Sequence, residues 1–411
     1  MTRGRPGKAQ ALSGMVVKTP NCMQNGVMYS RNINLDGARS FFLFGPRGTG
    51  KSTWLREILP QALFVDLLDS ETYTTLLARP NRLDALIPAS WTEWVVLDEV
   101  QKVPALLDEA HRLIESRRLR FVLTGSSARK LRGGGSNLLA GRAHLREMHP
   151  LTASELGKDF SLAHSLRYGQ LPLAYVDPNP GAFLKSYVHT YLREEIQQEG
   201  LTRRLSTFAR FLETASFSQG SLLNVAAVAR DAAAERKLVD SYFRILEDLL
   251  VGVQLQAFSR RAKRRLAHHP KFYFFDVGLF RALRPHGPLD SEAEMLGPAA
   301  ETLVLQELRA HNANADLSYE LSYWRTSSGA EVDFVLYGER GLVAIEVKAN
   351  ARLRGEDYRG LTAFRQDYPM ARLFLVYTGS RRSHEAGIDV VPLAEFLPQL
   401  GEILADPEAR L

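Results

Sequence analysis

Residues 41–55 read FFLFGPRGTGKSTWL, and this stretch decides the fold of the N-terminal part of the chain. Its apolar start, 41–44, predicts a buried strand. The strand leads into 45–52, which match the pattern G-x-x-x-x-G-K-[ST] at every defined position. Glycines let backbone N–H groups approach phosphate oxygens, and a helix that begins near Lys51 directs the positive end of its dipole to the same place. We therefore predict a phosphate-binding loop with ATP as its ligand.

Each polar residue of this loop has an expected role. Lys51 is expected to reach the β- and γ-phosphates, and the Ser52 hydroxyl is expected to bind Mg²⁺. A chance glycine-rich turn is the alternative, and the strand–loop–helix context argues against it. The expected nucleotide contacts are Gly45, Pro46, Arg47, Gly48, Thr49, Gly50, Lys51, Ser52 and Thr53.

A second apolar strand, 94–97, ends in two acidic residues, Asp98 and Glu99. A buried strand seldom ends in paired carboxylates unless a cation lies beside them. We expect Asp98 to hold Mg²⁺ through water, and Glu99 to be the general base on the water that attacks the γ-phosphate. Together the two motifs predict Mg²⁺-dependent hydrolysis of ATP.

The residues that follow extend this α/β pattern to about residue 158. Strands are expected over 62–67 and 119–124, and a fifth core element is expected to begin with 149–155. Ser126 follows the fourth strand and is expected to sense the γ-phosphate, with Thr124 as second choice and an ordinary turn serine as the alternative. Arg142 is expected to be an arginine finger that reaches a neighbouring subunit of a homo-oligomer such as a hexamer, or else a surface arginine.

The middle part, 159–290, has mainly helical patterns, at 183–198 and 208–217 among others. Residues 222–232 and 235–251 predict a helix-turn-helix, and strands at 253–258 and 272–275 then flank a basic loop. This order describes a winged helix whose loop contacts DNA phosphates, with a protein-binding module as the alternative. The expected DNA contacts are Arg260, Arg261, Lys263, Arg264 and Arg265, with Lys271 counted beyond them as part of the same basic run.

The last part, 291–411, carries acidic residues at regular places. Asp333 lies within an apolar strand, and Glu346 and Lys348 are two residues apart, so their side chains leave the same face of one strand. With Glu301 from a preceding helix they form a candidate Mg²⁺ site, in which Lys348 orients the attacking water. The alternative is a relic fold in which these charges pair with neighbours.

Composition limits the remaining possibilities. The chain has 411 residues, a net charge of +6 and a single cysteine, Cys22, which leaves no internal disulfide and no cysteine-based zinc site. No apolar run approaches the roughly 20 residues of a membrane span, and no secretory signal is visible, so a cytoplasmic protein is expected. Residues 1–28 are expected to be a disordered basic tail or an extension of the reading frame, with Met15 or Met28 as the start.

These motifs, in this order, resemble a family of prokaryotic P-loop ATPases with an AAA-type core and a C-terminal domain of unknown function, DUF4143. The resemblance implies an AAA+-like ATPase core at 29–158, a helical and winged-helix part at 159–290, and a restriction-endonuclease-like α/β domain of the PD-(D/E)xK type at 291–411. It gives the nuclease-like positions to Glu301, Asp333, Glu346 and Lys348. The carriers are GPRGTGKST (45–53), VVLDEVQKVP (95–104), LTGSSARKL (123–131), LAGRA (139–143), HPLTASEL (149–156), KFYFFDVGL (271–279), YWRTSSGAEVDFVL (323–336) and IEVKAN (345–350).

The sequence thus predicts an AAA+-like ATPase that moves or remodels duplex or branched DNA. One alternative is an ATP-gated DNA endonuclease that uses the C-terminal carboxylates. A second alternative is a signalling ATPase of the STAND type with protein partners. Stimulation of the ATPase by DNA separates the first two from the third, and metal-dependent cutting separates the first from the second.

Overall fold

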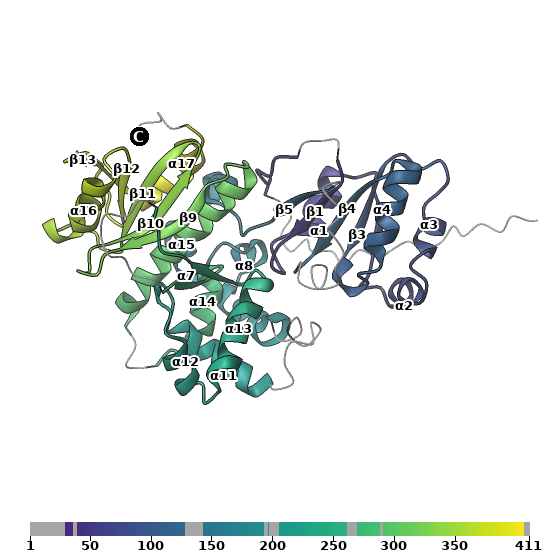
Figure 1. Ribbon diagram of the computed structural model, residues 1–411, viewed down its shortest axis with the longest axis horizontal. Coiled ribbons are helices and arrows are strands. Elements are labelled where there is room, and N and C mark those ends of the chain that lie inside the picture. The colour runs from purple at the N-terminus through teal and green to yellow at the C-terminus, as the bar shows by residue number, and fades with distance from the viewer. Residues whose placement is uncertain are drawn as a thin grey trace, which may run out of the picture.

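The structure is a computed structural model that describes residues 29–35, 39–127, 143–192, 196, 205–260, 269–287 and 291–406. An N-terminal α/β part lies to one side of a larger body formed by the middle and C-terminal parts (Figure 1). The expected tail at 1–28 and the candidate finger Arg142 lie outside the described residues.

The N-terminal part is built on a five-stranded sheet in the order β2-β3-β4-β1-β5, whose neighbouring strands are all parallel. Apolar clusters cover both faces, which explains why its central strands are near-continuous apolar runs. The strands are β1 (Phe41–Phe44), β2 (Leu63–Asp66), β3 (Trp94–Asp98), β4 (Arg120–Gly125) and β5 (His144–Glu147).

One expectation for this sheet was wrong. The fifth core element is not 149–155 but the edge strand β5, whereas 153–156 form a short helix with Thr152 as its capping residue. The four residues of β5, HLRE, pair only with β1 and are mostly not buried. An edge strand of this kind lacks the apolar run by which the inner strands were found.

Helices lie on both faces of the N-terminal sheet. Leu106, Leu107, Ala110 and Leu113 of α4 are buried against it, as their helical spacing predicts. The helices are α1 (Lys51–Ile58), α2 (Ser70–Ala78), α3 (Arg82–Leu86), the 3₁₀ turn η1 (Val100–Lys102) and α4 (Leu106–Arg117).

The middle part is mainly helical, as predicted. The helix expected over 183–198 begins at Pro180 and continues from Tyr187 as a π-helical turn. Two short helices, α6 (Ala153–Leu156) and η3 (Gly157–Asp159), lie at the junction with the N-terminal part. The helices that follow are α7 (Leu162–Tyr168), α8 (Pro172–Val176), α9 (Pro180–Ser186), η4 (Tyr187–Leu192), α11 (Leu205–Ser216), α12 (Val225–Asp231), α13 (Arg236–Asp248) and α14 (Val277–Leu283).

A small antiparallel sheet accompanies helices α11 to α13. Its strands are β6 (Ser221–Leu222), β7 (Gly252–Leu255) and β8 (Lys271–Phe274), in the order β6-β8-β7. Phe243 of α13 packs edge-to-face on Phe272 of β8, with ring centroids 4.9 Å apart. The helices and the sheet therefore share one packed interior.

The C-terminal part has a six-stranded sheet in the order β13-β14-β12-β11-β10-β9, with α15 and α17 on one face and α16 on the other. The strands are β9 (Glu320–Arg325), β10 (Glu331–Gly338), β11 (Gly341–Lys348), β12 (Arg372–Tyr377), β13 (Ser383–Glu385) and β14 (Ile388–Pro392). The helices are α15 (Glu292–Asn314), η5 (Gly355–Tyr358), α16 (Arg359–Asp367) and α17 (Leu393–Ala405).

The middle and C-terminal parts are joined by one hydrophobic core. It runs from Ala153 in α6, through α11 to α14, to the strands and helices around Phe396 and Leu404. The N-terminal sheet has separate cores on its two faces. Within the described ranges, no helix is long and apolar enough to cross a lipid bilayer.

Candidate functional site

The loop between β1 and α1 is shaped by its glycines. Gly48 and Gly50 have φ angles of 86° and 92°, in the left-handed region that favours glycine. At Gly45 an added Cβ would lie 2.4 Å from the carbonyl oxygen of Met148, so a larger residue would force the backbone apart. The loop therefore turns its backbone tightly ahead of α1, as a phosphate-binding concavity requires.

Lys51 is held inside this loop. Its side chain is buried, and the ammonium donates hydrogen bonds to the carbonyl oxygens of Gly45 at 2.7 Å and Pro46 at 3.3 Å. The positive charge consequently lies at the N-terminus of α1, where the helix dipole also favours an anion.

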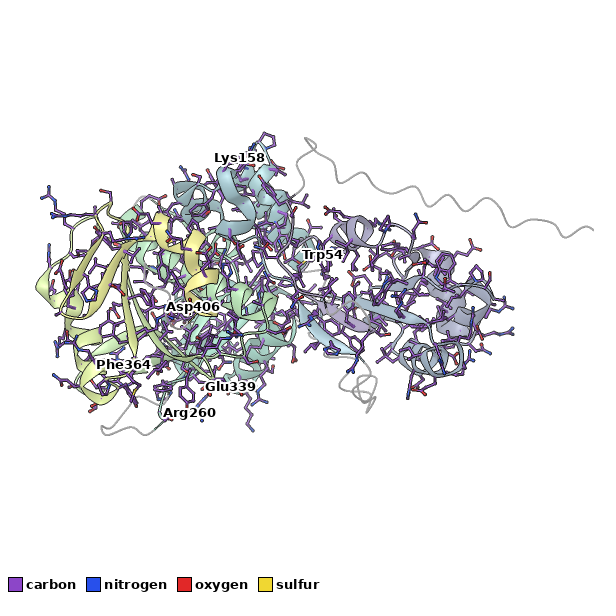
Figure 2. All side chains as sticks on the ribbon, turned by 90° about the horizontal axis from the view of Figure 1, so that it is seen from above. Trp54, Lys158, Arg260, Glu339, Phe364 and Asp406 are labelled. Atoms are coloured by element: carbon purple, nitrogen blue, oxygen red, sulfur yellow. The ribbon has the colours of Figure 1, made fainter. Side chains whose placement is uncertain are left out.

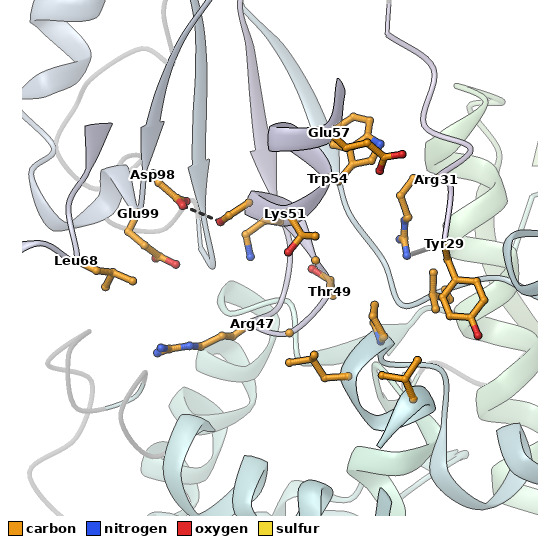
Figure 3. Close-up of a pocket in the computed structure, with 18 residues that line it drawn as sticks. Tyr29, Arg31, Arg47, Thr49, Lys51, Trp54, Glu57, Leu68, Asp98 and Glu99 are labelled. Atoms are coloured by element: carbon orange, nitrogen blue, oxygen red, sulfur yellow. Dashed lines mark hydrogen bonds between the residues drawn. The ribbon is translucent and has the colours of Figure 1, made fainter. Parts of the chain in front are cut away.

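Ser52 and Asp98 meet at the carboxyl ends of the parallel strands. The Ser52 hydroxyl donates a hydrogen bond to Asp98 Oδ2 at 2.7 Å, drawn as the dashed line in Figure 3. The other carboxylate oxygen of Asp98 accepts a hydrogen bond from the Thr124 hydroxyl. Because Ser52 donates its proton to Asp98, its oxygen lone pairs remain available. Hydroxyl and carboxylate oxygens are the ligands that Mg²⁺ prefers, so these residues fit the expected metal.

A pocket of about 280 Å³ opens over these residues. Arg47, Gly48, Thr49, Gly50, Lys51, Ser52 and Thr53 from the predicted contacts line it, as do Asp98 and Glu99. Sequence reasoning missed a further group of lining residues, some of which Figure 3 labels on the side away from Glu99. These are Tyr29, Arg31, Trp54, Glu57, Leu68, Leu151, Pro172, Leu173 and Val176.

Glu99 leaves β3 in an unusual conformation. Its φ of 61° is in the left-handed region, which costs a non-glycine residue on the order of 1 kcal/mol and is found preferentially at functional sites. The side chain accepts a hydrogen bond from Gln101 Nε2 at 2.5 Å. The paired acids are thus held in different ways, Asp98 by hydroxyl groups and Glu99 by an amide.

Gln101 is a second residue that the sequence did not single out. It is buried, and its amide also lies 3.2 Å from the Ser126 hydroxyl, so it links Glu99 to the end of β4. Its Oε1 has no hydrogen-bond partner within the described residues. The available signal was a glutamine in a buried turn directly after the two acids.

The two candidates for a γ-phosphate sensor take different places. Among the contacts of the described residues, Ser126 is linked to Glu99 through Gln101. Thr124 contacts Asp98 through its hydroxyl, which also accepts the backbone N–H of Glu99 at 3.4 Å. Thr124, the second choice, therefore lies closer to both acids than Ser126 does.

Of the five expected DNA contacts in the basic loop, Arg260 is the one that belongs to the described residues. The guanidinium of Arg260 lies 2.8 Å from Glu320 Oε2 and 4.9 Å from the ring centroid of Tyr337, at the edge of the C-terminal sheet (Figure 2). Arg261, Lys263, Arg264 and Arg265 lie outside the described residues.

The C-terminal acidic residues lie near one another, with an unexpected cation among them. Asp333 Oδ1 is 3.2 Å from the ammonium of Lys271, and Lys348 is 2.6 Å from Glu346 Oε1. The sequence placed Lys271 beyond the tip of the basic loop, with no partner among the acids; as the first residue of β8 it is only 2% exposed. Burial is the main cause that raises the pKa of Glu301, to about 8, and the pKa of Glu346.

The expected Mg²⁺ constellation is not formed. Among the residues that the structure describes, no group of three or more histidine, cysteine, aspartate or glutamate side chains is arranged to hold a metal ion. The physical reason is that Lys271 and the backbone N–H of Val347 take up both oxygens of Asp333, and Lys348 takes up Glu346 Oε1. Glu346 Oε2 is buried and has no hydrogen-bond partner among the described residues.

The fold and the site together define a P-loop nucleotide-binding protein of the AAA type. Family models for an AAA domain, for a domain of unknown function (DUF8612) and for a domain of unknown function (DUF4143) match residues 38–157, 160–290 and 296–396. The chain thus joins an N-terminal AAA domain to a C-terminal DUF4143 domain, which confirms the family predicted from its motifs.

Two relatives match most of the length of this chain. Uncharacterized proteins of Mycobacterium tuberculosis and Mycobacterium bovis are 29% identical over 349 residues, which cover 83% of this chain and 76% of theirs. Among solved structures, the Bacillus subtilis DNA clamp loader delta protein is 15% identical and covers 50% of this chain and 82% of its own, with a TM-score of 0.24. Can2 from Sulfobacillus thermosulfidooxidans, in complex with cyclic tetra-adenylate, is 11% identical, with coverages of 89% and 100% and a TM-score of 0.21.

Proposed function

We propose that the chain is a Mg²⁺-dependent ATPase that acts on DNA. The observation that carries the ATPase assignment is the Ser52–Asp98 hydrogen bond of 2.7 Å, in one pocket with Lys51 and Glu99. A phosphate-facing cation, oxygen ligands for Mg²⁺ and a carboxylate base are the groups that phosphoryl transfer to water requires.

Each residue of the site has its own role in the proposed hydrolysis of ATP. Loop N–H groups and the Lys51 ammonium bind the phosphates. To reach them, the ammonium gives up its hydrogen bonds to the carbonyl oxygens of Gly45 and Pro46. Ser52 and Asp98 would hold Mg²⁺, which neutralises charge on the phosphate oxygens. Glu99 takes the proton of the attacking water, and Gln101 sets the direction of its carboxylate.

Gln101→Leu should lower kcat by about 10- to 100-fold and leave KM for ATP nearly unchanged, because it misplaces the base without touching the phosphates. Gln101→Glu should place a like charge beside Glu99, which raises the pKa of the base and moves the acidic limb of the pH–rate profile upward. Steady-state phosphate release as a function of ATP concentration and pH measures both. Lys102→Ala, on the same turn but outside the pocket, is the control. An unchanged kcat in Gln101→Leu would remove Gln101 from the mechanism.

Action on DNA is the finer part of the proposal. It is supported by the net charge of +6, the dense basic run at 260–265 and the arrangement of α11, α12 and α13 around the sheet β6-β8-β7. We read that arrangement as a winged helix, with the basic run as the loop between β7 and β8. The same proposal includes a homo-oligomer, such as a hexamer, in which Arg142 serves the ATP site of a neighbour.

The deciding experiment measures ATP turnover with and without linear, nicked and branched DNA, and reads the DNA for cleavage in the same tubes. The expected result is a higher turnover with at least one form of DNA, all of which stays intact. Turnover that no DNA changes would favour the signalling ATPase with protein partners. Cut DNA would favour the endonuclease.

A further inference from the structure

Lys271 is the buried centre of the C-terminal acidic cluster. Its ammonium lies 3.2 Å from Asp333 Oδ1 and 3.9 Å from Glu301 Oε2, and it also pairs with Glu331. A lysine is almost never fully buried unless its charge is paired. Burial disfavours the charged form of Lys271, but the surrounding tyrosine and carboxylates outweigh burial and raise its pKa well above that of an ordinary lysine.

The contact joins two parts of the chain. Lys271 belongs to β8 in the middle part, whereas the carboxylates come from α15 and β10 in the C-terminal part. Tyr273 is two residues further along β8 and therefore faces the same way; its hydroxyl donates a 2.8 Å hydrogen bond to Glu301 Oε2. One face of β8 is thus matched to the acidic cluster by a charge and by a hydroxyl.

Each carboxylate of the cluster has a cationic partner within the protein. The ion pairs are Lys271 with Asp333, Arg325 with Glu331 at 3.0 Å, and Lys348 with Glu346 at 2.6 Å. Glu301 Oε2 accepts the Tyr273 hydroxyl and lies 3.9 Å from the Lys271 ammonium. A divalent cation bound to Asp333 would stand next to the Lys271 ammonium, and the repulsion of two cations at such a distance inside a protein is strong.

Most of the groups that a metal-dependent nuclease would use are also engaged, and the exception within the described residues is the buried oxygen Glu346 Oε2. Asp333 Oδ2 accepts the backbone N–H of Val347 at 3.0 Å, and the Lys348 ammonium is hydrogen-bonded to Glu346. The residues present therefore do not fit a Mg²⁺ site.

We propose that Lys271 takes the place of a divalent metal in this cluster and pins β8 to the C-terminal sheet, so that the C-terminal part neither binds Mg²⁺ at Asp333 nor cuts DNA. The cluster is an internal binding site for a lysine. This role does not depend on ATP hydrolysis.

The first test is Mn²⁺ binding to the full-length chain without nucleotide, followed by electron paramagnetic resonance. Wild type and Asp333→Asn should give the same binding curve, because wild type binds no Mn²⁺ at Asp333. Lys271→Met should gain a Mn²⁺ site that Lys271→Met/Asp333→Asn lacks. A Mn²⁺ site in wild type that Asp333→Asn removes, or nicking of supercoiled DNA by wild type with Mn²⁺, would overturn the proposal.

The second test measures thermal unfolding, because Lys271→Met leaves buried carboxylates without their cation. Its Tm should fall by about 10 °C, and the added Asp333→Asn change should recover part of this loss. Lys158→Met removes an exposed lysine of η3 and should leave the Tm unchanged (Figure 2). If Lys271→Met unfolds outright, the comparison of wild type with Asp333→Asn still decides. A Tm of Lys271→Met equal to that of wild type would refute the pinning role.

Discussion

Glu99→Gln should bind ATP as tightly as wild type and hydrolyse it about 10²- to 10⁴-fold more slowly. The amide has the shape of the carboxylate but does not accept the proton of the attacking water. Lys51→Ala should show the opposite defect, a loss of ATP binding, because it removes the cation held at the start of α1. ATP binding by calorimetry and phosphate release under single-turnover conditions separate the two defects.

The chain offers a matched control for this pair. Glu57 lines the same pocket but lies away from Asp98 and Glu99 (Figure 3), so Glu57→Gln should leave the hydrolysis rate close to that of wild type. Hydrolysis by Glu99→Gln at the wild-type rate would show that Glu99 is not the base.

The second large effect concerns the basic loop. The joint change of Arg260, Arg261, Arg264 and Arg265 to serine should weaken DNA binding and make it less sensitive to salt. Each lost phosphate contact lowers the slope of log K against log salt by roughly one. Between 50 and 200 mM salt, wild type should therefore lose about 10²-fold more affinity than the variant does. Fluorescence anisotropy with a labelled duplex at several salt concentrations measures both slopes.

A matched variant controls for net charge. Serine at Arg352, Arg354, Arg359 and Arg381, which are exposed positions of the C-terminal part, removes as many positive charges. It should leave the salt slope nearly unchanged. Equal slopes for wild type and the basic-loop variant would assign this loop to a protein partner.

The sequence predicted those features of the site whose residues are close together along the chain. The loop around Lys51 and the acids at Asp98 and Glu99 were predictable because each motif is contiguous and follows an apolar strand. The residues on the opposite wall of the pocket could not be predicted, because Tyr29 precedes the loop and Pro172 follows the whole α/β core in the sequence. Tertiary packing alone brings these residues together.

The burial of Lys271 is a second feature that the sequence could not predict. In the sequence it follows arginines and histidines, so its local context predicts an exposed basic residue. Its burial is decided by Asp333, 62 residues later, on a strand of another sheet. Local patterns therefore identified the acidic residues of the cluster but not the cation that balances them.

The helix α8 connects the nucleotide pocket to the hydrophobic core of the rest of the molecule. Pro172 and Leu173 line that pocket, while Ala174 of the same helix lies in the hydrophobic core shared by the middle and C-terminal parts. The pocket proposed for ATP thus lies between the N-terminal sheet, which has its own cores, and the core shared by the middle and C-terminal parts. In the proposed ATPase, a displacement of α8 would therefore also act on the hydrophobic core that joins the small antiparallel sheet to the C-terminal sheet.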